Sequence, residues 1–131
     1  MTSETILVVE DNEQNRILMR QILTYHGYKV LEAADGLTGL EMAREHQPAL
    51  ILLDIQMPVM NGFAVIRELR KQPGYLGKCK VIAVTSFAMK GDREKVFQAG
   101  FDEFVTKPID TRKLPELIKQ ILSQVEPHEP A

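Results

Sequence analysis

The chain has 131 residues, of which 44% are hydrophobic and 26% charged, and its formal charge at pH 7 is -2. These values are typical of one globular domain with a single core, and the charge argues against direct nucleic-acid binding or a polyacidic tail. One cysteine, Cys79, excludes an internal disulfide, and no signal peptide or bilayer-length apolar run is present, so we expect a cytoplasmic protein.

The predicted elements alternate between strands and helices along the chain. Helices are expected from Asn15 to a stop at Gly27, and then at 36–46, 62–69, 91–99 and 114–125. Strands are expected at 5–9, 29–33, 49–53, 80–84 and 102–106. Residues 72–75 read as a loop, because they contain Pro73-Gly74.

The strand at 49–53 is the one on which the rest of the prediction depends. Its sequence, Ala-Leu-Ile-Leu-Leu, is uninterrupted and apolar, which suits a central strand covered on both faces. Strands that alternate with helices predict an α/β fold with a parallel sheet and helices on both faces. We expect this domain to span residues 1–125, followed by a flexible tail at 126–131.

Four predicted strands end in polar residues that can carry chemistry. They are Glu10-Asp11 after the first strand, Asp54 after the third, Thr85 after the fourth and Lys107 after the fifth. In parallel sheets of this kind, ligands bind outside the carboxyl ends of the strands, so we expect these side chains to converge.

Three neighbouring carboxylates repel one another unless a cation lies between them. Oxygen ligands without a Cys or His pair favour a hard ion, so Glu10, Asp11 and Asp54 predict a magnesium site. A metal, the Lys107 ammonium and the Thr85 hydroxyl around one carboxylate would suit phosphoryl transfer, with Asp54 as the nucleophile. Taken singly, Lys107 could instead neutralise surplus acid and Thr85 could satisfy a loop amide.

Together these residues resemble the receiver domain of two-component response regulators, over nearly the whole chain. The resemblance rests on Glu10-Asp11, Asp54 with Pro58 and Gly62 after it, Thr85, and Lys107-Pro108. The stretch 87–92 is similar to single-domain regulators of the DivK type and to receivers of hybrid histidine kinases. The resemblance implies a CheY-like, doubly wound (βα)5 flavodoxin-like sandwich with strand order 2-1-3-4-5.

The resemblance also implies roles for individual residues. Asp54 would accept phosphate from a phosphohistidine, and Thr85 and Lys107 would contact the phosphoryl oxygens. Glu10, Asp11, Asp54 and the backbone carbonyl of Gln56 would hold Mg²⁺. Thr85 and Phe104 would form the conformational switch, with Phe104 where many relatives have tyrosine. The Lys107-Pro108 bond would be cis.

The implied partners are a histidine kinase or histidine phosphotransfer protein and a downstream protein target. The target would bind the face formed by the helix at 91–99, the strand at 102–106 and the last helix. Such a protein is not a classical enzyme, although it promotes its own phosphorylation and dephosphorylation. Phe87, Met89 and Met60 are candidates for exposed apolar contacts or for the core, and none of His26, His46 and His128 reads as a ligand.

Several alternatives stay open. A haloacid-dehalogenase-type phosphatase also forms an aspartyl phosphate, but Gln56 stands where its second aspartate would be. A flavodoxin-like binding module would need a phosphate-binding loop where this chain has Glu10-Asp11. Two further alternatives are a receiver that docks partners without being phosphorylated and a receiver cut from a hybrid histidine kinase.

Overall fold

The computed structural model describes residues 4–86 and 90–123. The expectations for Phe87, Met89, His128 and the tail at 126–131 lie outside these residues. In chain order the elements are β1 (Thr5–Val9), α1 (Glu13–Tyr25), β2 (Lys29–Ala33), α2 (Gly36–His46), β3 (Leu50–Asp54), α3 (Gly62–Lys71), α4 (Tyr75–Lys78), β4 (Lys80–Thr85), α5 (Lys90–Ala99), β5 (Glu103–Thr106) and α6 (Lys113–Ser123).

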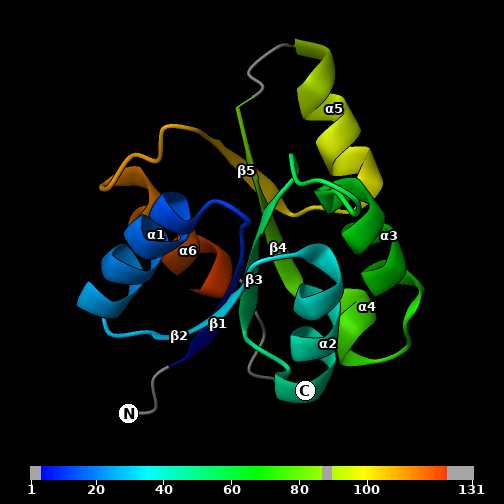
Figure 1. The fold of residues 1–131 in the computed structure, drawn as a ribbon, viewed down its shortest axis with the longest axis horizontal. Coiled ribbons are helices and arrows are strands. Elements are labelled where there is room, and N and C mark those ends of the chain that lie inside the picture. Colours follow the sequence, from blue (N-terminus) through cyan, green and yellow to red (C-terminus); the bar gives the residue numbers. More distant parts are fainter. Residues whose placement is uncertain (1–3, 87–89, 124–131) are drawn as a thin grey trace.

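The five strands form one parallel sheet in the order β2-β1-β3-β4-β5, as the resemblance implied. Helices α1 and α6 cover one face, and α2 to α5 lie on the other (Figure 1). The predicted α/β sandwich is therefore confirmed. At the carboxyl edge, Val9 of β1 pairs with Leu53 of β3, and Asp54 pairs with Val84 of β4.

Side chains of the central strands alternate between two hydrophobic cores. On β3, Leu50 and Leu52 face the core under α1 and α6, whereas Ile51 and Leu53 face the core under the other helices. All five residues of β3 are buried, as expected for a central strand with an uninterrupted apolar sequence. Asp54 therefore ends a strand that is packed on both faces.

Local sequence signals explain where the main helices begin. Side chains of Asn12, Asp35 and Asn61 accept hydrogen bonds from backbone N–H groups in the first turns of α1, α2 and α3. The structure differs from the prediction at 72–75, because the four-residue helix α4 begins at Tyr75. Such a short turn has no readable hydrophobic period. Among the described helices, none is long and apolar enough to cross a membrane.

Candidate functional site

The end of β1 places two acids at the carboxyl edge of the sheet. Glu10 is fully buried, and its N–H donates to Ala33 O at the end of β2. Its Oε2 accepts a hydrogen bond of 3.0 Å from the Asn12 N–H, which bends the side chain back over the turn. Asp11 is exposed between these two residues, so one acid of the pair is accessible to solvent and the other is not.

The end of β3 holds the third acid. Asp54 is buried, with 1% of its surface exposed, and its Oδ1 accepts a 2.9 Å hydrogen bond from the Gln56 N–H. The other oxygen, Oδ2, lies 3.1 Å from the Lys107 Nζ. The Asp54 carboxylate is therefore fixed in position by a backbone donor on one oxygen and a cation on the other.

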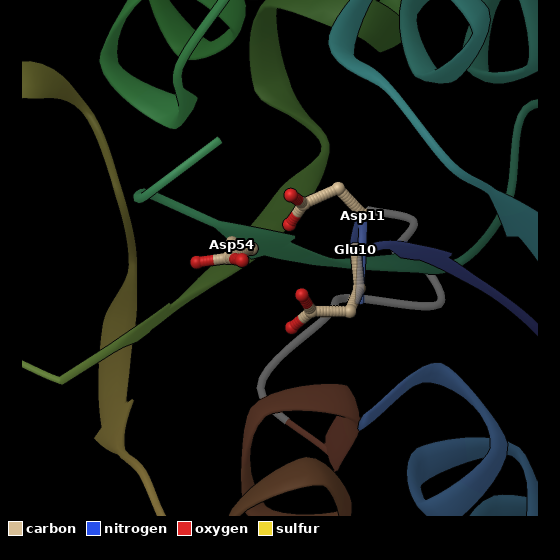
Figure 2. Close-up of side chains that lie close together, drawn as sticks. All are labelled: Glu10, Asp11 and Asp54. Carbon is tan, nitrogen blue, oxygen red and sulfur yellow. The ribbon is translucent and has the colours of Figure 1, made fainter. Parts of the chain in front are cut away.

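The three carboxylates form one cluster. Oxygen atoms of Glu10, Asp11 and Asp54 all lie within 4.8 Å of one another, and Figure 2 shows the first two side chains reaching toward the end of β3. Glu10 Oε1 is buried and accepts no hydrogen bond from the described residues, although Lys107 Nζ lies 3.3 Å away as an ion-pair partner. A buried carboxylate oxygen without a donor, beside two other acids, fits a divalent cation with oxygen ligands.

Burial and the neighbouring charges shift the pKa values of Glu10 and Lys107. Burial, and after it the neighbouring Asp54 carboxylate, together raise the pKa of Glu10 from 4.5 to about 7, against the lowering effects of the Asn12 N–H and of Lys107. Burial alone would lower the pKa of Lys107, but the carboxylates of Asp54 and Glu10 outweigh it and raise that pKa. Lys107 therefore stays charged between the two acids.

The remaining predicted residues lie on β4, on β5 and just after β5. Thr85 is the buried last residue of β4, and its carbonyl accepts a hydrogen bond from the Lys107 N–H. Lys107-Pro108 is a cis bond, as the resemblance implied. Phe104 lies on β5 and is half-buried, with its ring packed edge-on against Phe97 of α5.

The structure also shows contacts that the sequence did not predict. The Gln56 side-chain oxygen accepts a 2.6 Å hydrogen bond from the Ser86 N–H, which joins the loops after β3 and β4. The Arg93 guanidinium lies 5.4 Å from the Phe97 ring centre and 5.5 Å from that of Phe104. No sequence signal identifies such pairs, because they depend on how separate loops and elements pack.

The described contacts of His26 and His46 do not involve the acidic cluster. His26 contacts Ile22 O on α1, and His46 lies near Glu45 on α2. Met60 is half-buried and packs against the core under α2 and α3. Met60 is therefore at most a partial surface contact.

Comparisons with known proteins agree with this geometry. Residues 6–119 match the response regulator receiver domain. The polar-differentiation response regulator DivK of Brucella anthropi is 43% identical over 119 residues, which cover 91% of this chain and 96% of that protein.

Two solved receiver domains of histidine kinases are also similar. The signal receiver domain from Syntrophus aciditrophicus is 31% identical, with a TM-score of 0.87 and coverage of 98% of this chain and 97% of that one. The receiver domain of a sensor histidine kinase from Pseudomonas aeruginosa is 32% identical, with a TM-score of 0.86 and coverage of 94% and 100%, and it has a magnesium ion coordinated in its active site cleft. With the strand order, the acidic cluster and the family match in agreement, the chain belongs to the response regulator receiver domains of two-component signalling.

Proposed function

We propose that this receiver domain accepts a phosphoryl group on Asp54 from a phosphohistidine of a partner protein. The observation that carries the proposal is the setting of the Asp54 carboxylate, which is buried, lies 3.1 Å from the Lys107 ammonium and belongs to the acidic cluster. A carboxylate held beside a cation is a nucleophile placed where the charge of a phosphoryl group can be neutralised.

In the proposed reaction, an Asp54 carboxylate oxygen attacks phosphorus. The phosphorus–nitrogen bond to the histidine breaks, and its electron pair leaves with the imidazole. Lys107 would neutralise charge on the peripheral phosphoryl oxygens, and the Thr85 hydroxyl would donate a hydrogen bond to them. Members of this family are not classical enzymes. The domain would promote its own phosphorylation and dephosphorylation through these groups.

The proposed metal is magnesium. Glu10, Asp11, Asp54 and the backbone carbonyl of Gln56 would hold it, and it would supply positive charge to the phosphoryl oxygens. Two observations support this choice. Glu10 Oε1 accepts no hydrogen bond from the described residues, and all the candidate ligand atoms are oxygens. The magnesium in the Pseudomonas aeruginosa receiver domain supports it further.

Phosphorylation would be read out by another protein through the face formed by α5, β5 and α6. Thr85 and Phe104 would couple the site to this face by shifting the balance between two conformations. A groove of about 460 Å³ lies there between β5 and α6, and its lining includes Phe104, Leu114 and Leu117. Receiver domains interact with histidine kinases or phosphotransfer proteins and with downstream targets. We propose the cytoplasm as the place where this one does so.

A second candidate function is that of a receiver domain within a hybrid histidine kinase, and the two similar receivers that belong to histidine kinases favour it. In that case the domain, residues 1–125, would accept its phosphoryl group within a hybrid histidine kinase rather than as a DivK-like regulator. The chemistry at Asp54 would be the same.

Intact-mass spectrometry after incubation with acetyl phosphate tests the assignment. The wild-type chain should gain the mass of one phosphoryl group in the presence of Mg²⁺ and none in EDTA, whereas Asp54→Asn should gain none. Asp35→Asn, which changes a helix cap on α2, is the matched control and should be labelled like the wild type. Equal labelling of Asp54→Asn would contradict the proposal.

A further inference from the structure

Arg16 of α1 contacts the backbone of the turn that carries two of the cluster's acids. Its Nη1 donates a 2.9 Å hydrogen bond to the Glu10 carbonyl oxygen, and its own backbone N–H donates to Asn12 O. The other side of its guanidinium faces β2, where Nε lies 3.3 Å from Glu32 Oε1. The side chain therefore spans from β2 to the acidic turn.

Arg16 completes a three-point attachment of Glu10. The Glu10 N–H donates to Ala33 O, its Oε2 accepts from the Asn12 N–H, and its carbonyl accepts from Arg16. Since Asp11 follows directly, the direction of both carboxylates depends on this one peptide geometry. The fixed planar fork of arginine can donate to a carbonyl and a carboxylate at the same time, which the single ammonium of lysine does less well.

Arg20 provides an internal comparison one helical turn further along α1. Its Nη1 lies 3.0 Å from Glu32 Oε2, so it pairs with the same carboxylate as Arg16. The contacts of Arg20 do not include the acidic turn, and its side chain is 46% exposed against 19% for Arg16. The two arginines share a helix, a charge and a partner, and they differ in the contact with Glu10.

We propose that Arg16 is a positioning residue for the acidic cluster: through the Glu10 carbonyl it holds the turn of Glu10 and Asp11 in the geometry that binds a divalent cation. The inference rests on the proposed magnesium site. Residues that orient metal ligands from outside the coordination shell typically change metal affinity by about 10- to 100-fold when they are replaced. Arg16 is thus expected to matter for affinity well beyond its share in the ion pair with Glu32.

Isothermal titration calorimetry with MgCl₂ tests the inference on the wild type, Arg16→Lys and Arg20→Lys. All three proteins keep the same net charge. We expect the Kd for Mg²⁺ to rise about tenfold in Arg16→Lys and to change less than about twofold in Arg20→Lys. In ¹H–¹⁵N NMR spectra of the metal-free proteins, the Asp11 and Asn12 amide signals should shift in Arg16→Lys and stay in place in Arg20→Lys.

Two outcomes would overturn the inference: a wild-type Kd in Arg16→Lys, or an equal loss of affinity in both variants, which would place the effect in the shared ion pair. A wild type that binds no Mg²⁺ would instead refute the proposed metal site itself. If Arg16→Lys does not fold, Arg16→Gln and Arg20→Gln replace the two lysine variants. Both lose one charge and one partner of Glu32, but only Arg16→Gln loses the guanidinium contact with the Glu10 carbonyl. Weaker Mg²⁺ binding in Arg16→Gln alone would support the inference, and equal binding in the two variants would overturn it.

Discussion

Lys107 links two of the buried acids at the site. Its Nζ lies 3.1 Å from Asp54 Oδ2 and 3.3 Å from Glu10 Oε1, and only 18% of its side chain is exposed. Breaking a buried ion pair by removing one partner is costly, because the other charge is left without compensation in a medium of low dielectric constant. Here two carboxylates would be left in that state.

Replacing Lys107 by methionine should therefore make folding depend on the metal. In EDTA we expect Lys107→Met to lower the free energy of unfolding by about 3–5 kcal/mol. In millimolar Mg²⁺ the loss should shrink, because a cation that binds the folded state stabilises it by mass action and compensates the same carboxylates. Urea unfolding followed by circular dichroism, in EDTA and in MgCl₂, measures both values.

Lys80→Met is the matched control for this experiment. Lys80 pairs with Asp102 at 3.9 Å, and its side chain is 30% exposed. An ion pair of this kind contributes at most about 1 kcal/mol, so the loss should be small and the same with and without Mg²⁺. A Lys107→Met loss that does not change with Mg²⁺ would argue against a metal at the acidic cluster.

At this scale, the sequence predicted which residues meet but not how they are bonded. Glu10, Asp11, Asp54 and Lys107 were expected together because parallel strands end at one edge of the sheet, and the structure brings them together. Their roles in phosphoryl transfer remain a proposal. The contacts of the Arg16 guanidinium with the Glu10 carbonyl and with Glu32 could not be predicted, since they depend on how α1 is rotated against β2.

Helix α3 begins in close contact with the backbone at the end of β3. A Cβ atom built on Gly62 would lie 2.7 Å from the Asp54 carbonyl oxygen and 2.7 Å from Ile55 Cα. Real side chains do not approach backbone atoms that closely, so glycine is required here by space rather than by backbone angle. The first residue of α3 thereby touches the backbone of the nucleophile proposed above.

Gly62→Ala should consequently displace α3 or the end of β3. We expect a loss of about 1–3 kcal/mol in the free energy of unfolding, as for other overpacked sites. Mg²⁺ affinity should fall as well, because the Asp54 backbone moves. Urea unfolding and Mg²⁺ titration measure the two effects.

Gly27→Ala is the control for Gly62→Ala. Gly27 follows α1 with a φ of +91° and has no atom within 4 Å of a built Cβ. This variant should cost about 1–2 kcal/mol from backbone strain alone and leave Mg²⁺ affinity unchanged. If Gly62→Ala binds Mg²⁺ as the wild type does, α3 does not position the site.

At the scale of elements, the main strands and helices could be predicted because each has a long signal. Apolar runs marked the strands, and the apolar stripe of the last helix matches the buried residues Leu114, Ile118 and Ile121 of α6. The prediction missed α4, whose first residue, Tyr75, lies in the segment 72–75 that was expected to be a loop. It also ended β3 before Asp54, because a buried carboxylate in a strand is unusual unless the charge is used.

For the whole molecule, the alternation of elements was enough to predict a parallel sheet covered on both faces. It was not enough to order the strands, because an alternating chain is compatible with several right-handed windings. The order 2-1-3-4-5 came from the family resemblance and is confirmed. This order makes β1, β3 and β4 adjacent strands. The three acids and Thr85 therefore lie at neighbouring strand ends on the carboxyl edge of the sheet.

The extent of the domain is a prediction for the whole chain. A protein that ends at Val125 should have the same free energy of unfolding as the full chain, within about 0.5 kcal/mol, since the domain is proposed to span residues 1–125. A protein that ends at Leu117 should fail to fold, because it lacks Ile118 and Ile121, whose exposed fractions in α6 are 0% and 5%. Each such side chain contributes about 1.5–3 kcal/mol of burial, and losing both with the last turns of the helix uncovers part of the face that α1 and α6 cover together. Urea unfolding of the three proteins decides the boundary: a loss of stability on removing 126–131 would place part of the fold in the tail.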